Sequence, residues 1–195
     1  MAQRITTWDG QSWLLDPGAL FLDFVYTGDF GVGAWHDGIF HTAEALDAWL
    51  AEHVTPKLSP TTSRELEQAL TLRDSLCRLV KLAAGLSQTS EERDTSFVMQ
   101  VASEPDIPPM FPDHDPAMPF VTTQALSTIA RDAVVKLRDH GDRLRNCCGD
   151  GCPMVYLDLS RAGKRAWCSM SRCGNRAKAR AFRARATERT THEKE

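Results

Sequence analysis

The sequence predicts an α+β fold. A mostly helical body with a small β-hairpin is followed by a ribbon-like treble of strands and a basic helix. Three observations support this. Apolar residues recur at the helical period of 3.6 in several stretches of residues 1–140. Five of the six cysteines fall within 27 positions near the C-terminal end. Residues 1–142 carry 10 Lys and Arg against 21 Asp and Glu, whereas residues 143–195 carry 13 against 5.

The first half of the body contains two predicted helices. Residues 1–18 hold turn signals around short apolar pieces and indicate a strand or an irregular arm. Residues 19–26 form the most apolar run, and at this length the pattern does not decide between helix and strand. Thr42 is a good N-cap for a helix that runs to about His53. A capping box at Thr62-x-x-Glu65 begins the longest helix, which we expect to end at Gly85.

The second half of the body is predicted to supply the hairpin and a third helix. Residues 97–101 and 120–123 are rich in apolar and β-branched types, so we expect two paired strands. Several prolines between them indicate an extended connection. Apolar residues from 126 to 137 follow the helical period, which predicts a helix from about Gln124 to His140, ended by Gly141.

The clustered cysteines indicate one metal site. Cys147 and Cys152 form one C-x4-C pair, Cys168 and Cys173 form a second, and fifteen residues separate the pairs. Four thiolates at such spacing suit a tetrahedral, structural Zn²⁺ in a zinc-ribbon-like module. Cys148 could replace Cys147 as a ligand, and the equal loops favour Cys147. Zinc would stabilise a module too small to have a sufficient core of its own.

The residues around these cysteines resemble a known family. Asp158-x-Ser160, Arg165-x-Trp167-Cys168 and Cys173-Gly174-Asn175-Arg176 are similar to the CGNR zinc finger over positions 143–176. The run of residues 22–25 and the Trp49-Leu50 pair resemble the ABATE domain that usually precedes this finger. Tyr26 stands where that family commonly carries asparagine, which would alter any pocket there. The resemblance implies a stress-related transcriptional regulator of bacteria.

This gives three expected parts of the chain. Residues 1–140 would be an ABATE-like body that senses a small-molecule effector or forms a homodimer. Residues 141–187, called the cysteine module below, would be the CGNR finger. Residues 188–195 are polar and expected to be disordered.

The basic residues of the cysteine module predict binding to DNA. Arg172, Arg176, Arg180 and Arg183 are spaced i, i+4, i+8 and i+11, which places them in one stripe of a helix. Arginine matches phosphate oxygens bidentately. The full set of expected nucleic-acid contacts is Arg165, Arg172, Arg176, Lys178, Arg180, Arg183 and Arg185. The alternatives are a solvated basic face, docking on the acidic body, or a module that binds RNA or protein.

The body offers a weaker candidate site. Asp23, Tyr26, His36 and His41 could line a ligand pocket, and an enzyme centred on this region is a third hypothesis. No known catalytic motif occurs, so we expect no enzyme. The N-terminus lacks the features of a signal peptide and no window is long and apolar enough to span a bilayer. These observations predict a cytoplasmic protein without a membrane partner.

Overall fold

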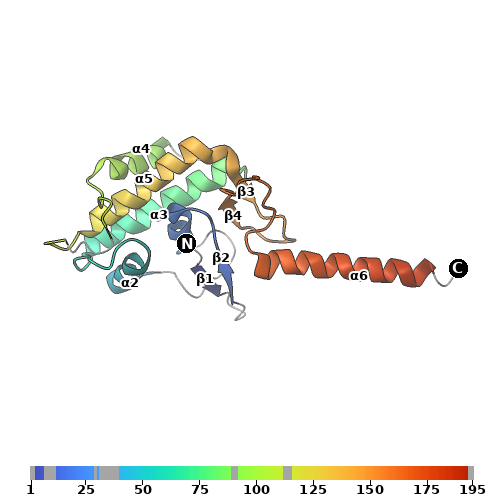
Figure 1. Cartoon of the computed structure of the whole chain (residues 1–195). Coiled ribbons are helices and arrows are strands. Elements are labelled where there is room, and N and C mark those ends of the chain that lie inside the picture. The colour runs from blue at the N-terminus through green and yellow to red at the C-terminus, as the bar shows by residue number, and fades with distance from the viewer. Residues whose placement is uncertain are drawn as a thin grey trace.

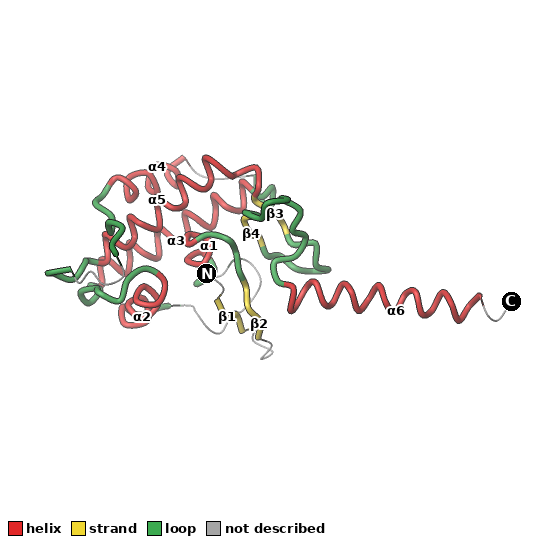
Figure 2. The backbone as a smooth tube through the Cα atoms, in the orientation of Figure 1, coloured by secondary structure: helices red, strands yellow, loops and turns green. Residues whose placement is uncertain are grey.

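The computed structural model describes residues 3–6, 12–28, 30, 40–88, 92–111 and 116–192 (Figures 1 and 2). The body consists of β1 (Gln3–Thr6), β2 (Ser12–Leu15), α1 (Leu20–Val25), α2 (Ala43–His53), α3 (Ser63–Ala83), α4 (Glu92–Ser103) and α5 (Thr122–His140). The cysteine module consists of a 3-10 turn (Gly141–Arg143), β3 (Leu144–Asn146), β4 (Val155–Leu157), a π-helical turn (Met170–Gly174) and α6 (Asn175–His192).

Three helices, α3, α4 and α5, lie side by side and form the main layer of the body (Figure 1). The predicted capping box of α3 is confirmed, because the backbone N–H of Thr62 donates to Glu65 Oε2 at 2.8 Å and the Glu65 N–H donates back to Thr62 Oγ1. The helix ends before Gly85, whose φ of 70° lies in the left-handed region that glycine tolerates best. Two other predicted helices are also confirmed. The first begins after Thr42 and ends at His53, and the second ends at His140.

The hairpin that was predicted from residues 97–101 and 120–123 is wrong. The first segment lies inside α4, and its buried Val98 and Val101 face the helical layer. A bidentate contact of Arg78 on α3 with the buried carboxylate of Asp94 ties α4 in place. In the second segment Phe120 makes only an isolated bridge with Leu58 before α5 begins. The hairpin of the body is instead β1 with β2, in antiparallel register.

The apolar run of residues 19–26, left open between helix and strand, is the short helix α1. Its residues 21–25 are all buried, including the carboxyl group of Asp23. The helix packs against α3 and α5. Its N-terminal end is fixed by a hydrogen bond from the Phe21 N–H to Asp132 Oδ2 of α5, at 3.0 Å.

The cysteine module shares one hydrophobic core with the body. Met154, Val155 and Leu157 belong to the same buried cluster as the side chains of α1 and α5. The body also covers the outer edge of β4, because the Leu157 N–H donates to Pro17 O at 2.8 Å. Gly18 permits this approach, since a Cβ at its position would clash with Leu157 O.

The prediction of three strands in the cysteine module is wrong. In the described part of the chain the module has a two-stranded antiparallel sheet, β3 with β4. The segment between β4 and Cys168 forms no third strand, although the Cys148 N–H donates to Ala166 O at 2.9 Å. That segment is held mainly by side-chain contacts of Arg165, which are described below.

Helix α6 leaves the module and extends away from the body (Figure 1). Residues 181–185 are all exposed, and Phe182 is 68% exposed. The side chains of Ala181, Phe182 and Ala184 therefore do not pack against the rest of the described chain. No helix in the described ranges is long and apolar enough to cross a membrane.

Candidate metal centre and basic cleft

The four predicted ligands come together in the structure. The Sγ atoms of Cys147, Cys152, Cys168 and Cys173 all lie within 4.8 Å of one another. The Cys152–Cys168 and Cys168–Cys173 sulfur separations are 3.7 and 3.8 Å. A tetrahedron with Zn–S bonds of about 2.3 Å has edges of about 3.8 Å. The arrangement therefore fits one zinc ion, and the sulfurs are too far apart for disulfides.

The loop between the first two cysteines is shaped around the sulfurs. The N–H groups of Gly149 and Cys168 donate to Cys147 Sγ at 3.4 and 3.3 Å, which suits a thiolate acceptor. A Cβ on Gly149 would lie 2.8 Å from Cys173 Sγ. Glycine is therefore required where the loop passes the fourth ligand.

The protonation of the cluster is coupled. Hydrogen bonds from Cys152 and Cys168 lower the pKa of the Cys147 thiol. The same contacts with Cys147 raise the pKa of Cys152 to about 12 and also raise the pKa of Cys168. One sulfur is thus favoured as a thiolate at the expense of its neighbours. A divalent cation removes this competition, because it takes the place of the shared protons.

The fourth ligand, Cys173, is carried by a tight π-helical turn. The N–H groups of Cys173 and Gly174 both donate to Ser169 O, at 3.0 and 3.1 Å. A Cβ on Gly174 would lie 2.6 Å from Met170 Sδ and 3.3 Å from the Trp167 ring. The turn passes directly into α6, so the fourth ligand is covalently joined to the start of the basic helix.

A second set of contacts holds the segment between the cysteine pairs. The Asp158 carboxylate, fully buried, accepts from the backbone N–H groups of Ser160 and Arg165 at 3.0 and 2.9 Å. Burial alone would raise the pKa of Asp158, but these hydrogen bonds outweigh it and lower the pKa. The Arg165 guanidinium lies 4.4 Å from the centroid of the Tyr156 ring.

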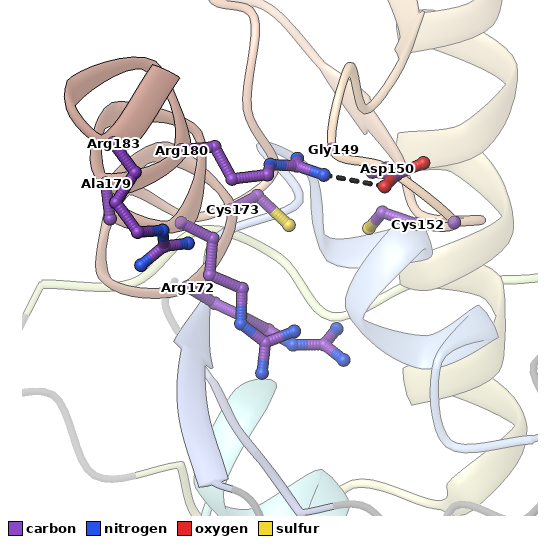
Figure 3. Close-up of a pocket in the computed structure, with 10 residues that line it drawn as sticks. Gly149, Asp150, Cys152, Arg172, Cys173, Ala179, Arg180 and Arg183 are labelled. Atoms are coloured by element: carbon purple, nitrogen blue, oxygen red, sulfur yellow. Dashed lines mark hydrogen bonds and ion pairs between the residues drawn. The ribbon is translucent and has the colours of Figure 1, made fainter. Parts of the chain in front are cut away.

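A basic cleft lies beside the metal ligands (Figure 3). Its volume is about 480 Å³. One wall is the loop from Gly149 to Cys152, and the other is the π-helical turn with the first turns of α6. Four guanidinium groups line it, from Arg172, Arg176, Arg180 and Arg183. The cleft therefore combines both cysteine pairs with the predicted arginine stripe.

Comparison with known families agrees with this geometry. Residues 143–186 match the model of the CGNR zinc finger. Residues 18–140, more than half of the chain, match the ABATE model, described as "Putative stress-induced transcription regulator". The chain belongs to the ABATE family. A search of curated proteins found no match. The description is of a regulator family and not of an enzyme family.

The other cysteines of this ABATE protein stay outside the cluster. Cys148 is exposed, so the structure places Cys147 and not Cys148 among the four sulfurs. Cys77 is half-buried on α3, and burial raises the pKa of its thiol. It packs against the hydrophobic core.

The predicted nucleic-acid residues divide into three groups. The four stripe arginines line the basic cleft. Lys178 and Arg185 lie exposed on α6 but do not line the cleft. Arg165 lies elsewhere, because its guanidinium donates to the carbonyl groups of Asp16, Trp167 and Cys168. The bond to Asp16 joins the body to the module, and the other two lie within the module, so we assign Arg165 a structural role.

Of the four residues predicted to line a pocket in the body, the three that the structure describes lie in different surroundings. Tyr26 is buried, and its hydroxyl donates to Val155 O at 2.6 Å and accepts from the Val155 N–H at 2.8 Å. It therefore joins the ABATE domain to β4 and does not line a pocket. Asp23 is buried in α1, which raises its pKa to about 7, whereas His41 is exposed before α2. His36 lies outside the described residues.

A different hollow occurs on the ABATE domain. An apolar groove of about 510 Å³ runs between the C-terminal parts of α3 and α5 and the middle of α4. Its lining is almost entirely aliphatic: Leu76, Leu79, Leu82, Ala83, Val98, Met99, Ala133, Val134 and Leu137, with Thr95 and Gly141. None of these residues was among those predicted from the sequence to line a pocket.

Sequence reasoning missed two residues at the basic cleft. The Arg172 guanidinium lies 3.8 Å from the centroid of the Trp13 ring on β2, so the hairpin of the body supports one cleft arginine. Asp150 forms an ion pair with Arg180, at 2.6 Å (Figure 3). The separation of 159 positions between Trp13 and Arg172 leaves no local signal. Asp150 could have been noticed as one of the few acids in the module.

Proposed function

We propose that this protein is a transcription regulator that binds duplex DNA through the cysteine module. The observation that carries the proposal is the convergence of four guanidinium groups on one cleft at the start of an exposed helix. Guanidinium groups bind phosphate oxygens bidentately and release counterions from DNA. The exposed face of α6 is long enough to follow a groove.

The charge order of this helix supports the same proposal. A helix dipole favours acidic residues in the first turn, yet Arg172 and Arg176 occupy the first two turns of the continuous π- and α-helical segment. The helix dipole taken alone makes these two charges unfavourable. Departures from local preference are expected where a residue serves a partner. A polyanion at this end would turn the unfavourable charges into favourable contacts.

In this proposal Cys147, Cys152, Cys168 and Cys173 hold one Zn²⁺. The ion would act structurally, since four protein ligands leave no open position for a substrate or water. Its role would be to fix the loop containing Gly149 against the turn that begins α6. The two walls of the basic cleft would then depend on the metal for their separation.

Binding can be tested by fluorescence anisotropy with labelled duplex DNA across a salt series. We expect log Kd to rise linearly with log salt, and the triple variant R176A/R180A/R183A to lower the slope by about 3. Arg64→Ala on α3 is the matched control, because it removes an exposed arginine of the body. Absence of duplex binding by the zinc-loaded protein would refute the proposal. A preference for single-stranded or duplex RNA would favour the RNA-binding alternative.

We further propose that the apolar groove of the ABATE domain is where a small apolar effector binds. Its volume falls within the range of small-molecule sites, and its walls offer apolar surface from three helices. An environment-sensitive apolar fluorophore should bind the wild-type protein, and Met99→Glu should abolish that binding, since Met99 is 49% exposed at the groove. Equal fluorescence from both proteins would contradict this assignment.

A further inference from the structure

We infer that the basic cleft seats one backbone phosphate of DNA, and that Asp150 occupies this seat when DNA is absent. The inference rests on the proposed DNA binding. It adds that a carboxylate of the protein itself competes with the DNA phosphate for the cleft. Asp150 Oδ2 lies 2.6 Å from Arg180 Nη1, across the cleft from α6 (Figure 3). A carboxylate presents two oxygens to a guanidinium much as a phosphodiester does.

The composition of the cleft supports an anionic occupant. Asp150 is the one carboxylate among its lining residues, and it faces four arginines. Cys152 and Cys173 also line the cleft, so the charge of the metal site counts. Four thiolates with one Zn²⁺ carry a charge of about −2. With Asp150 included, the cleft carries one net positive charge, and without its carboxylate it carries two.

The ion pair is suited to being displaced. The side chains of Arg180 and Asp150 are 47% and 80% exposed. Exposed pairs of this kind contribute only about 0–1 kcal/mol. A DNA phosphate arrives with neighbouring phosphates that engage the rest of the stripe, and it releases condensed counterions. DNA can therefore replace the carboxylate, while isolated anions compete less well.

The position of Asp150 is fixed by the metal loop. The Cys152 N–H donates to Gly149 O at 2.9 Å, and Gly151 adopts a φ of 63°. This turn places Asp150 at the tip of the loop, facing α6. The carboxylate thus stays close to Arg180, and it lowers the affinity of the cleft for every DNA sequence. Because the carboxylate opposes specific and non-specific DNA alike, it sets the overall affinity and leaves the ratio between sequences unchanged.

The test compares Asp150→Asn with Asp142→Asn, which removes the same charge from another exposed acid of the module. Both proteins are zinc-loaded, and zinc content and circular dichroism are measured first. We expect D150N to bind duplex DNA about three- to fivefold more tightly at low salt, with a salt slope steeper by about 0.9. D142N should change the affinity less than about twofold, through long-range charge alone.

A second pair of variants checks that the effect passes through Arg180. In an Arg180→Gln background, D150N should have no larger effect than D142N, since the paired guanidinium is gone. If wild-type protein binds DNA but D150N and D142N behave alike, the competitor role of Asp150 is refuted and DNA binding stands. If no variant binds DNA, the proposed function itself fails. A tightening confined to duplex RNA would overturn the assignment of the seat to DNA.

Discussion

Replacing Tyr26 by phenylalanine should weaken the contact between the cysteine module and the ABATE body and so lower the free energy of unfolding. Val155 lies at a position of the β3–β4 ladder that makes no bond to β3. The flanking ladder bonds run from the Cys147 N–H to Met154 O and from the Asp158 N–H to Arg143 O. The Tyr26 hydroxyl is the partner of both backbone groups of Val155, and Val155 is fully buried.

The expected loss follows from these two bonds. Phenylalanine keeps the ring but leaves one buried N–H and one buried C=O without a partner. Each such group costs about 1–3 kcal/mol, so the free energy of unfolding should fall by about 3 kcal/mol. That is a large fraction of the 5–15 kcal/mol typical of a domain.

Urea denaturation of the zinc-loaded protein, followed by tryptophan fluorescence, measures this change. Tyr156→Phe is the matched control, because the Tyr156 hydroxyl serves only the carbonyl oxygen of Arg165 among the bonds described. It should cost about 1 kcal/mol. Release of zinc to a chromophoric chelator should be faster in Tyr26→Phe than in the control. A change below about 0.5 kcal/mol in Tyr26→Phe would refute this account of the joint.

Three further predictions concern single positions. Asp23 has a pKa of about 7 because it is buried, so the folded state holds a proton that the unfolded state releases near pH 4. Stability relative to Asp23→Asn should therefore fall as pH rises from about 4 to 7, by up to about 4 kcal/mol, in urea titrations. Gly149→Ala should weaken zinc binding about 10–100-fold in chelator competition, because the new Cβ meets Cys173 Sγ. Cys148→Ser should retain one zinc per chain by elemental analysis, whereas Cys147→Ser should lose it.

Each of these has a control or a contrary outcome. A pH-independent difference between wild type and Asp23→Asn would mean that this carboxyl is ionised throughout. Gly141→Ala serves beside Gly149→Ala, since a Cβ at Gly141 meets nothing within 4 Å. Loss of zinc in Cys148→Ser, with retention in Cys147→Ser, would show that Cys148 and not Cys147 is the ligand.

Local signals in the sequence were sufficient where a single segment determines its own structure. The capping box at Thr62 and the left-handed Gly85 define α3 with no help from the rest of the chain. The equal spacing of the two cysteine pairs identified the cluster, because loop length decides which sulfurs can converge on one metal.

Local signals failed where contacts with residues far along the sequence determine the secondary structure or the role of a side chain. Residues 97–101 have too short an apolar run to separate strand from helix, and the contact of Asp94 with Arg78 on α3 secures the helical form. The role of Tyr26 depends on Val155, 129 positions away. Arg165 looked like a phosphate ligand because charge alone does not show that three carbonyl groups already surround its guanidinium.

Because Cys173 leads directly into α6, a small rotation at the metal site produces a large displacement at the far end of this helix. Its 18 residues span about 27 Å at a rise of 1.5 Å per residue. A rotation of about 10° at the metal would carry the far end through about 5 Å, which exceeds the rise of about 3.4 Å between stacked base pairs. In the proposed complex with DNA, small changes in the coordination geometry would therefore shift the far end of α6 by more than one base-pair step. In that complex, exchange of zinc for a larger ion would change the bases that α6 contacts while all four cysteines stay bound.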